Sequence, residues 1–431
     1  MSEFKCVHFI GVGGVGMSAL ARILYEKGVS VSGSDLSYSK YIKRLEDIGV
    51  KVEVGHSASN LPDECDLVVI SSAIPETNPE LVKARELNYT VIKRGDLLAL
   101  LMKMQKGIAV AGAHGKTTTS SMVSLILENA GYDPTIVVGG ELCNLSSNAK
   151  LGKGEYLVAE ADESDGSFLT LVPQIAMITN IEDDHLDYYG GTDELFDAFQ
   201  SFINNIPAGG VLVICGDDKH ADDLKIPNGI KLMKYGIGEN NNYQVRNILL
   251  SAEYSAADIY FQEEYLCRLE LIITGMHNII NALGAIAVAA EAGISLASSV
   301  DILKSFRGVE RRFQLIGECK EIKIIDDYAH HPTEIKATLQ AARQSHQGRV
   351  VAIFQPHRYS RTRQLYQEFG GSFGEADQVI ITDVYGAGEK PVPGITGELI
   401  YNEAKKAFPD KEIDYVETDK LPAYLLEKCR P

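Results

Sequence analysis

The chain has 431 residues, of which 45% are hydrophobic and 23% are charged, a balance that is typical of a globular protein and argues against disorder. The length predicts roughly three domains. A formal net charge of −18, without any block of Lys and Arg, disfavours nucleic acid as a partner, so acidic ligands must be bound at local sites.

A strand-like apolar run at residues 6–10 leads into the turn GVGGVG at residues 11–16, and a helix-like run follows. This G-x-G-x-x-G pattern places a diphosphate at a helix N-terminus. Asp35 ends a second strand-like run nineteen residues after Gly16, where dinucleotide folds place the carboxylate that binds a ribose hydroxyl. The pattern predicts a diphosphate-linked nucleotide without choosing between NAD and another one, and a purely structural turn is the alternative.

Further strands are expected at residues 50–54, 67–72 and 90–92, with helical stretches between them. This alternation predicts a small βαβ domain with a parallel sheet, which we assign to residues 1–100. The first apolar run is short, broken by glycine and not preceded by a basic region, so it is interpreted as neither a signal peptide nor a membrane span.

A second glycine-rich turn, AGAHGKTTT at residues 111–119, lies between a strand-like and a helix-like run. In such a loop the backbone NH groups cradle phosphates, the Lys116 ammonium reaches their outer oxygens, and the Thr117 hydroxyl meets Mg²⁺. The first glycine of the usual pattern is replaced by Val110, and Gly112 stands closer to Gly115, so the loop is a shortened variant. We expect it to bind a nucleoside triphosphate; an ordinary turn with solvated Lys and Thr is the alternative.

We assign residues 101–306 to a central domain around this loop. Its other expected elements are strands at residues 156–159, 175–179 and 211–214, a polar insert of antiparallel appearance near residues 240–271, and an alanine-rich helix at residues 281–292. Asn278 and Asn281 open this helix one turn apart on one face. Their amides suit an adenine edge, although N-capping by Asn278 explains the first equally well.

Acidic residues follow two of the central strands. The run EADESD at residues 160–165 stands where a carboxylate can ligate Mg²⁺ directly or through water, with a solvated acidic loop as the alternative. The run TNIEDDHLD at residues 179–187 contains His185. Because Mg²⁺ prefers oxygen ligands, the chemistry alone makes His185 a supporting or structural histidine rather than a direct ligand.

The third domain, residues 307–431, has strand-like runs at residues 322–325, 350–354 and 379–382. Charged and aromatic groups gather near the strand ends, as Arg311-Arg312, DDYAHHP at residues 326–332 and HRYSR at residues 357–361. Pro332 suits the first turn of a helix. Arginines in an acidic protein suggest bidentate capture of a carboxylate or phosphate, with surface solvation as the alternative for each one.

The seven cysteines are scattered, and no C-x-x-C pair occurs. This spacing argues against a disulfide framework or a zinc site and indicates reduced thiols. We therefore expect a cytoplasmic protein.

The motifs G-x-G-G-x-G-M-S, G-x-H-G-K-T-T-T, E-A-D-E-S-D, T-N-I-x-x-D-H-L-D-Y-Y, H-N-x-x-N-A, E-R-R-F, D-D-Y-x-H-H-P and H-R-Y-S-R occur in this order. In combination they are very specific, and the chain resembles the Mur ligases over essentially its whole length. The similarity is greatest to the members that join L-alanine to UDP-N-acetylmuramate. The alternative member joins a preformed peptide to the same UDP-sugar.

The resemblance implies an α/β protein of three domains: a Rossmann-like UDP-binding domain, a central P-loop-type ATPase with a mostly parallel sheet, and a Rossmann-like C-terminal domain. It implies ATP-dependent amide formation through an acyl phosphate, in peptidoglycan precursor synthesis, with Mg²⁺ or Mn²⁺. The partners implied are UDP-N-acetylmuramate and L-alanine, with no nucleic acid and no membrane span. Monomer and homodimer both stay open.

The resemblance also implies site residues. Those expected to bind the UDP-sugar are Gly11, Gly13, Gly14, Gly16, Met17, Ser18, Asp35 and Ser71. Those expected to bind ATP are Gly112, His114, Gly115, Lys116, Thr117, Thr118, Asn278, Asn281, Arg312 and Asp327. The implied metal ligands are Thr117, Glu160 and His185, and the implied amino-acid-binding residues are Tyr328, His357, Arg358 and Arg361. Catalytic roles are implied for Lys116, His330, Arg358 and Arg361.

Two departures from the family pattern stand out. Many relatives carry a carbamylated lysine fifteen residues after the metal histidine, but this position is Gln200 here, so no carbamate can form. The resemblance also leads us to expect a further strand and helix after Pro431. Two rivals from other classes are an NAD-dependent dehydrogenase, which leaves Lys116 and the arginines unexplained, and a nonhydrolysing nucleotide-binding regulatory module, which Glu160 and His185 disfavour.

Overall fold

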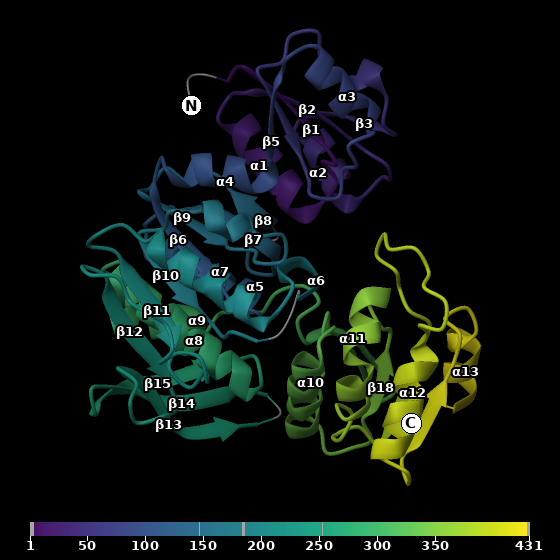
Figure 1. Ribbon diagram of the computed structural model, residues 1–431. Coiled ribbons are helices and arrows are strands. Elements are labelled where there is room, and N and C mark those ends of the chain that lie inside the picture. The colour runs from purple at the N-terminus through teal and green to yellow at the C-terminus, as the bar shows by residue number, and fades with distance from the viewer. Residues whose placement is uncertain (1–3, 146, 183–185, 252, 429–431) are drawn as a thin grey trace. The chain divides into compact units, whose positions relative to one another are not determined.

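The computed structural model describes residues 4–145, 147–182, 186–251 and 253–428 (Figure 1). The chain divides into two compact units. The first consists of Met1–Arg246, Asp258–Leu269 and Ile280–Val309, and the second of Asn247–Ala257, Glu270–Ile279 and Glu310–Pro431.

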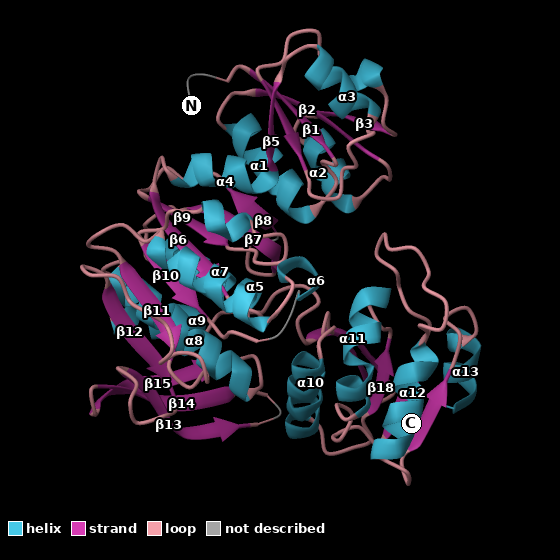
Figure 2. Ribbon diagram, viewed as in Figure 1, coloured by secondary structure: helices cyan, strands magenta, loops and turns pink. Residues whose placement is uncertain are grey.

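The first unit begins with a five-stranded parallel sheet of strand order β3-β2-β1-β4-β5 (Figure 2). Its strands are β1 Cys6–Ile10, β2 Ser30–Asp35, β3 Lys51–Val54, β4 Leu67–Ile70 and β5 Thr90–Lys93. The helices are α1 Val15–Glu26, α2 Lys40–Asp47, η1 Ala58–Asn60, α3 Pro79–Glu86 and α4 Arg94–Met102. The strand order reverses at β1, which is where a doubly wound sheet opens a crevice for a ligand.

A ten-stranded, mostly parallel sheet follows, of order β15-β14-β13-β12-β11-β10-β6-β9-β7-β8. The strands on the β6 side are β6 Lys106–Ala111, β7 Thr135–Leu142, β8 Ser147–Lys150, β9 Tyr156–Glu160 and β10 Ile175–Ile178. The remaining strands are β11 Val211–Cys215, β12 Lys231–Gly236, β13 Tyr243–Leu250, β14 Ser255–Phe261 and β15 Glu264–Leu271. The associated helices are α5 Lys116–Asn129, η2 Ser167–Thr170, α6 Leu186–Tyr189, α7 Thr192–Asn204, α8 Met276–Glu291 and α9 Leu296–Leu303.

The position of β6 matters most for the site. It lies between β9 and β10, and it runs parallel to both. The carboxyl ends of three parallel strands therefore meet at one edge of the sheet, and the loops that follow β6, β9 and β10 are neighbours there. Four consecutive residues of β6, Ile108 to Ala111, are completely buried, as expected for a strand covered on both faces.

The second unit contains a three-stranded parallel sheet of order β18-β19-β20. The strand expected at residues 322–325 exists, but it pairs antiparallel with an earlier strand in a separate two-stranded ribbon. The strands are β16 Gln314–Cys319, β17 Ile322–Asp326, β18 Val351–Phe354, β19 Gln378–Ile381 and β20 Glu412–Tyr415. The helices are α10 Pro332–Ser345, α11 Tyr359–Gly370, α12 Gly397–Ala407 and α13 Leu421–Lys428. A core around Phe354, Phe369 and Phe373 joins α10, α11 and α12 to the sheet.

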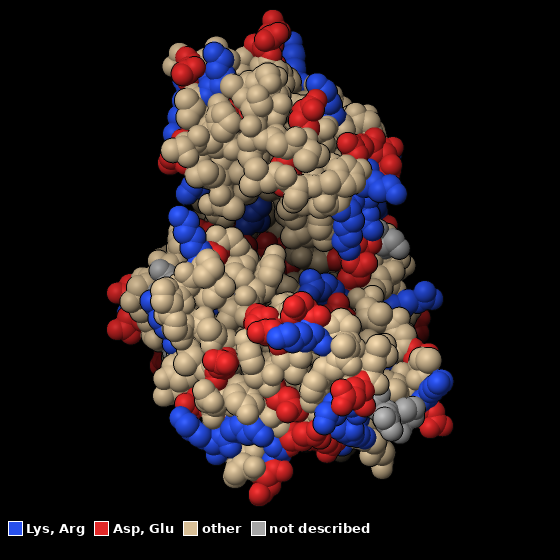
Figure 3. Space-filling view, turned by 90° about the vertical axis from the view of Figure 1, so that its right-hand side faces the viewer, with Lys and Arg blue, Asp and Glu red and all other residues tan. Residues whose placement is uncertain are grey.

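The α/β class and the mostly parallel central sheet are thus confirmed. Within the described residues, no helix has both the length and the apolar character needed to cross a membrane. Acidic and basic side chains are interspersed over the face drawn in Figure 3.

Candidate active site

The glycine-rich loop after β6 has the shape of a phosphate-binding loop. Gly112 and Gly115 have φ angles of +125° and +81°, which residues with a side chain rarely adopt. A Cβ atom on Gly112 would lie 2.2 Å from Oγ1 of Thr179, and one on Gly115 would lie 2.7 Å from Oδ1 of Asn281. Both glycines are therefore required by backbone conformation and by close packing, and Asn281 lies directly against the loop.

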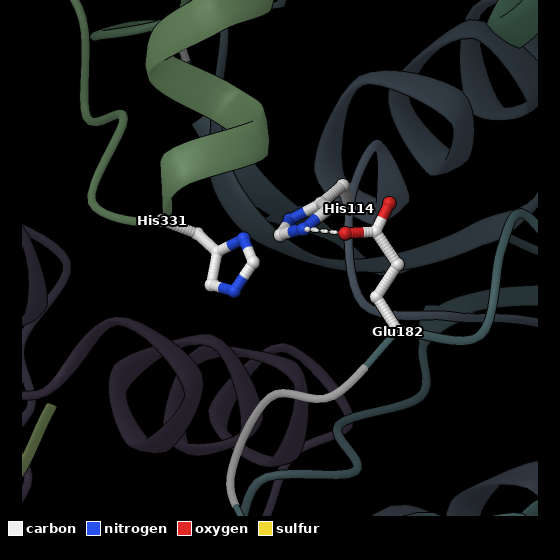
Figure 4. A group of neighbouring side chains, drawn as sticks. All are labelled: His114, Glu182 and His331. Atoms are coloured by element: carbon white, nitrogen blue, oxygen red, sulfur yellow. Dashed lines mark ion pairs between the residues drawn. The ribbon is translucent and has the colours of Figure 1, made fainter. Parts of the chain in front are cut away.

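The loop after β10 holds the phosphate loop in place, a role that sequence reasoning missed. Thr179 Oγ1 donates a hydrogen bond to the His114 carbonyl at 2.6 Å, and Asn180 Nδ2 donates to the same oxygen at 3.0 Å. In return His114 N donates to Asn180 Oδ1 at 2.9 Å. The side chain of His114 points toward Glu182, with Nε2 3.4 Å from Oε2 (Figure 4).

Lys116 begins α5, and its ammonium is surrounded by oxygen atoms. Nζ donates to the carbonyls of Gly112 and Ala113 at 2.5 and 3.1 Å, and to Oε1 of Glu163 at 2.7 Å. Burial raises the pKa of the Glu163 carboxyl to about 7, with Lys116 opposing this shift and Asp162 adding to it. Burial disfavours the lysine cation, but attraction by the carboxylates raises the pKa of Lys116 overall. Burial therefore dominates the raised pKa of Glu163, whereas the surrounding carboxylates account for the raised pKa of Lys116.

Thr117 and Glu160 approach the same short stretch of β7. Glu160 Oε2 accepts a hydrogen bond from Gly139 N at 2.9 Å, and a Cβ on Gly140 would lie 2.8 Å from Cγ2 of Thr117. Two of the three expected metal ligands are thus brought to one pair of glycines. The third, His185, lies outside the described residues. The side chains of Thr117 and Thr118 are themselves buried.

The acidic run after β9 is not a uniform metal site. Arg94, the first residue of α4, donates from Nη2 to Asp162 Oδ2 at 3.1 Å and lies 3.6 Å from Asp165 Oδ2. Burial acts to raise the pKa of Asp162, but Arg94 and Ser164 outweigh it, and the pKa is lowered. Sequence reasoning missed Arg94 because nothing local to it signals a partner 68 residues away.

The N-terminal glycine loop follows β1. The NH groups of Gly11 and Val12 both donate to the Ser34 carbonyl, and Gly13 N donates to Asp35 Oδ2 at 2.9 Å. A Cβ on Gly13 would lie 2.9 Å from the same carboxylate oxygen. Asp35 is therefore part of the loop's own support, and binding of a ribose by it stays a prediction.

The other residues expected to bind the UDP-sugar differ in whether their side chains border the glycine loop or pack elsewhere. Ser71 Oγ lies 3.1 Å from the Cβ position of Gly11, so its hydroxyl borders the loop. Arg94 Cδ lies 3.1 Å from the Cβ position of Gly16. The Met17 side chain packs in the core, and the Ser18 hydroxyl donates to the carbonyl of Val15 at 3.0 Å. The structure gives these last two side chains a packing role, and their ligand role stays a prediction. Gly14 is the N-cap of α1.

Asn278 is not the N-cap of α8. It is the third residue of the helix, and its amide donates to the Thr274 carbonyl at 2.7 Å. The capping interpretation is therefore wrong, and the adenine interpretation stays a prediction.

In the second unit, residues expected to bind the amino acid lie around the Tyr328 side chain. The rings of Tyr328 and His330 have centroids 5.0 Å apart, and Tyr328 Oη lies 3.5 Å from His357 Nε2. The Arg311 and Arg312 guanidiniums lie 4.8 and 5.9 Å from the centroid of the Tyr328 ring. These contacts bring aromatic and cationic groups from three segments together.

His357 is held neutral by its surroundings. Burial lowers its pKa to about 4, and the positive charges of His330, Arg361 and Arg358 act in the same direction. Arg361 is buried, with Nη1 3.4 Å from His357 Nδ1. The group therefore offers cationic donors beside a neutral imidazole.

Asp327 and Arg312 are also placed. Asp327 accepts from Phe313 N at 2.6 Å and from Ala329 N at 2.7 Å, while burial raises the pKa of its carboxyl despite these bonds. Arg312 Nη1 lies 3.5 Å from Glu334 Oε1. Pro332 occupies the first turn of α10, as expected.

Comparison with known proteins covers the whole chain. Residues 6–106 match the Mur ligase family catalytic domain, residues 110–289 the Mur ligase middle domain, and residues 311–431 the Mur ligase glutamate ligase domain. The UDP-N-acetylmuramate--L-alanine ligase of Desulforamulus reducens is 49% identical, over 99% of this chain and 93% of that protein. The enzyme of the same name from Pelotomaculum thermopropionicum is 50% identical, over 100% of this chain and 94% of that protein.

Two solved structures extend the comparison. The UDP-N-acetylmuramate-alanine ligase of Thermotoga maritima has a TM-score of 0.83 at 32% identity and covers 99% of this chain and 93% of its own. A murein peptide ligase from Psychrobacter arcticus has a TM-score of 0.75 at 25% identity, covering 99% of this chain and 94% of its own. Matches to three Mur ligase domain families, which together span most of the chain, and nearly full-length relatives at about half identity leave one conclusion: the chain belongs to the Mur ligase family.

Proposed function

We propose that this chain is an ATP-dependent, ADP-forming ligase that joins L-alanine to the lactyl carboxylate of UDP-N-acetylmuramate, a step of peptidoglycan precursor synthesis. The observation that carries the proposal is 49–50% identity over nearly the full length of relatives named for this reaction. The murein peptide ligase is only 25% identical, which favours a free amino acid over a preformed peptide as the acceptor.

The reaction has two steps. The lactyl carboxylate attacks the γ-phosphorus of ATP, giving an acyl phosphate and ADP. The amine of alanine, after losing a proton, attacks the acyl carbon, and inorganic phosphate leaves. Positioning and charge stabilisation supply most of the catalysis in phosphoryl transfer, so the task of the protein is to place cations and donors around the transferring group.

Lys116 is the principal cation for the first step. Its ammonium already lies among three oxygen acceptors, of which only Glu163 is charged. Moving from Glu163 to the γ-phosphate would keep the ammonium paired and place its charge where negative charge spreads in the transition state. The backbone NH groups at the N-terminus of α5 would hold the phosphates beside it.

A Mg²⁺ or Mn²⁺ ion fits the donor set of this loop. The Glu160 carboxylate and the Thr117 side chain, the latter through its methyl group, lie beside the same pair of glycines in β7. Carboxylate and hydroxyl oxygens are the hard donors that such an ion prefers. Asp162 and Glu163 add negative charge close by. When bound, such an ion neutralises phosphate charge as a Lewis acid. His185 stays a further predicted ligand.

The N-terminal glycine loop is proposed to hold the UDP-sugar diphosphate. Within this described segment, Gly14, the N-cap of α1, makes no side-chain hydrogen bond to the first NH groups of the helix. These NH groups are proposed to donate to the diphosphate. Titration calorimetry distinguishes this proposal from a dinucleotide site. Binding of UDP-N-acetylmuramate is expected, and tight NAD binding without a response to the UDP-sugar would overturn it.

The acceptor residues lie in the second unit. Arg358 and Arg361 are proposed to bind the alanine carboxylate, since guanidinium groups form paired bonds with carboxylates. Tyr328, His330 and His357 would border the amine and the acyl group. Arg312 and Asp327 are proposed to contact ATP, together with Asn278 and Asn281 at adenine.

A cytoplasmic monomer or homodimer is proposed, and six cysteines in the described residues are free thiols.

The test is phosphate release with ATP and UDP-N-acetylmuramate, screened across the amino acids, with the product identified by mass. Release that depends on L-alanine and yields the alanyl product supports the proposal. Release that depends on a peptide, and not on any free amino acid, would assign the alternative ligase reaction instead.

A further inference from the structure

Arg358 has a backbone conformation that residues with a side chain rarely adopt. It is the last residue before α11, with φ at 70° and ψ at 138°. Such a conformation is strained, and it persists only where neighbouring groups fix it. Arg358 is also proposed to bind the carboxylate of L-alanine. The groups that hold its backbone in this conformation are therefore relevant to function.

The segment of residues 385–389 supplies the first of these groups. Arg358 N donates to the Tyr385 carbonyl at 2.8 Å, and Tyr385 N donates to the Pro356 carbonyl at 2.8 Å. These two bonds form a parallel bridge between His357 and Tyr385. On the other side, Thr362 donates to the Arg358 carbonyl from N and Oγ1, at 3.1 and 2.9 Å. The peptide groups on both sides of the strained residue are therefore fixed.

Glu389 completes the arrangement. Its Oε1 accepts from Ser360 Oγ at 2.5 Å and its Oε2 from Ser360 N at 3.0 Å. The chain turns back toward α11 through Ala387 and Gly388, both with positive φ, and Glu389 N donates to the Gly386 carbonyl at 2.9 Å. The carboxylate thus occupies the N-terminal end of α11, where a negative charge is stabilised.

The environment of Glu389 keeps this carboxylate charged. Partial burial would raise its pKa, but the two Ser360 bonds, a backbone bond from Tyr359 and the charge of Arg358 together lower it. Gly386 is also required, because a Cβ there would lie 2.8 Å from the Glu389 carbonyl and 3.0 Å from the Tyr359 ring. The turn at Gly386 therefore packs closely against the N-terminal end of α11.

We infer that Glu389 is a positioning residue: by fixing Ser360 and the end of α11, it holds Arg358 in the strained conformation that directs its guanidinium to the acceptor carboxylate. The inference rests on the proposed function, in which Arg358 binds alanine. Without Glu389, only the bonds with Tyr385 and Thr362 hold this conformation, and Arg358 relaxes toward negative φ more readily. Its Cα–Cβ bond then turns, and the guanidinium leaves its position.

The test uses steady-state kinetics of the full-length protein with Glu389→Ala. A misplaced binding group is expected to raise the KM for L-alanine roughly 10- to 100-fold. The KM values for ATP and for the UDP-sugar should stay within about twofold, since phosphate contacts do not run through α11. Glu368→Ala is the matched control, because Glu368 is an exposed glutamate on the same helix, and its KM values should match wild type.

A double mutant distinguishes positioning from a general loss of structure. If Glu389 acts through Arg358, adding Glu389→Ala to Arg358→Ala should raise the alanine KM no further. Additive effects, or an unchanged alanine KM in the single mutant, would overturn the inference. Should Glu389→Ala not fold, Ser360→Ala replaces it, with an expected rise of about threefold for one lost bond. Failure of the wild type to use L-alanine would instead refute the proposed function.

Discussion

The ammonium of Lys116 lies 2.7 Å from a carboxylate oxygen of Glu163, and the Glu163 side chain is only 2% exposed. The ammonium is therefore already paired with a buried carboxylate, and a phosphate oxygen of ATP would have to displace this carboxylate in order to pair with Lys116. Glu163 comes from the loop after β9, and Lys116 begins α5 directly after the loop that follows β6, so the pairing is a product of sheet order and not of local sequence.

Lys116→Ala is expected to fold and to lose roughly 10²- to 10³-fold in kcat, because the ammonium stabilises charge that develops on the transferring phosphoryl group. Folding should survive because Glu163 can take up a proton once the Lys116 ammonium is removed. Phosphate release and circular dichroism check both parts. Lys27→Ala, at an exposed lysine after α1, is the control, and near-normal release from folded Lys116→Ala would remove this loop from the mechanism.

Glu163 should make the stability of the protein depend on pH. Its folded pKa of about 7 lies above the ordinary 4.5, so the folded state binds more protons than the unfolded state between these values. The free energy of unfolding of wild type should therefore fall as pH rises from about 4.5 to 7, by at most about 3 kcal/mol, relative to Glu163→Gln. Urea unfolding of both proteins at several pH values measures this difference. Parallel pH profiles would show that the carboxyl titrates normally.

Gly115→Ala should weaken ATP binding far more than its backbone strain alone explains. A Cβ at this position would meet Oδ1 of Asn281 at 2.7 Å, so the loop, α8 or the Asn281 side chain must move. Gly28→Ala is a matched control, since Gly28 has φ of +85° against +81° but nothing within 4 Å of its Cβ position. Thermal melting should show the strain cost in both proteins and a further loss in Gly115→Ala from the clash with Asn281, and calorimetry with ATP should show a loss only in Gly115→Ala. Equal ATP affinities would contradict the packing argument.

Activity should not respond to bicarbonate. Gln200 stands where the resemblance to the family leads us to expect a carbamylated lysine, and its amide makes a pair of 2.8 Å bonds with the backbone of Lys225. This pairing gives the side chain a structural role in place of a metal-bridging one. Rates in degassed buffer with and without added bicarbonate decide the matter, and a strong rise on addition would contradict the prediction.

Local sequence patterns predicted the helices, strands and loops, but not all of the contacts between them. The strand, glycine loop and helix around Lys116 could be read from the sequence because each part has its own signal over a few residues. That Thr179 and Asn180 would support His114, or that Arg94 would pair with Asp162, depends on which strands are neighbours. Sheet order is set by packing over the whole domain, so a single sequence does not show it.

The most direct test of the account follows an oxygen atom. UDP-N-acetylmuramate labelled with ¹⁸O in its lactyl carboxylate is incubated with the protein, ATP and L-alanine, and the released phosphate is analysed by mass. An acyl phosphate intermediate predicts that one labelled oxygen moves from the carboxylate to each phosphate, because the bond from phosphorus to that oxygen persists while the acyl carbon is attacked. Formation of the alanyl product with unlabelled phosphate would contradict the mechanism.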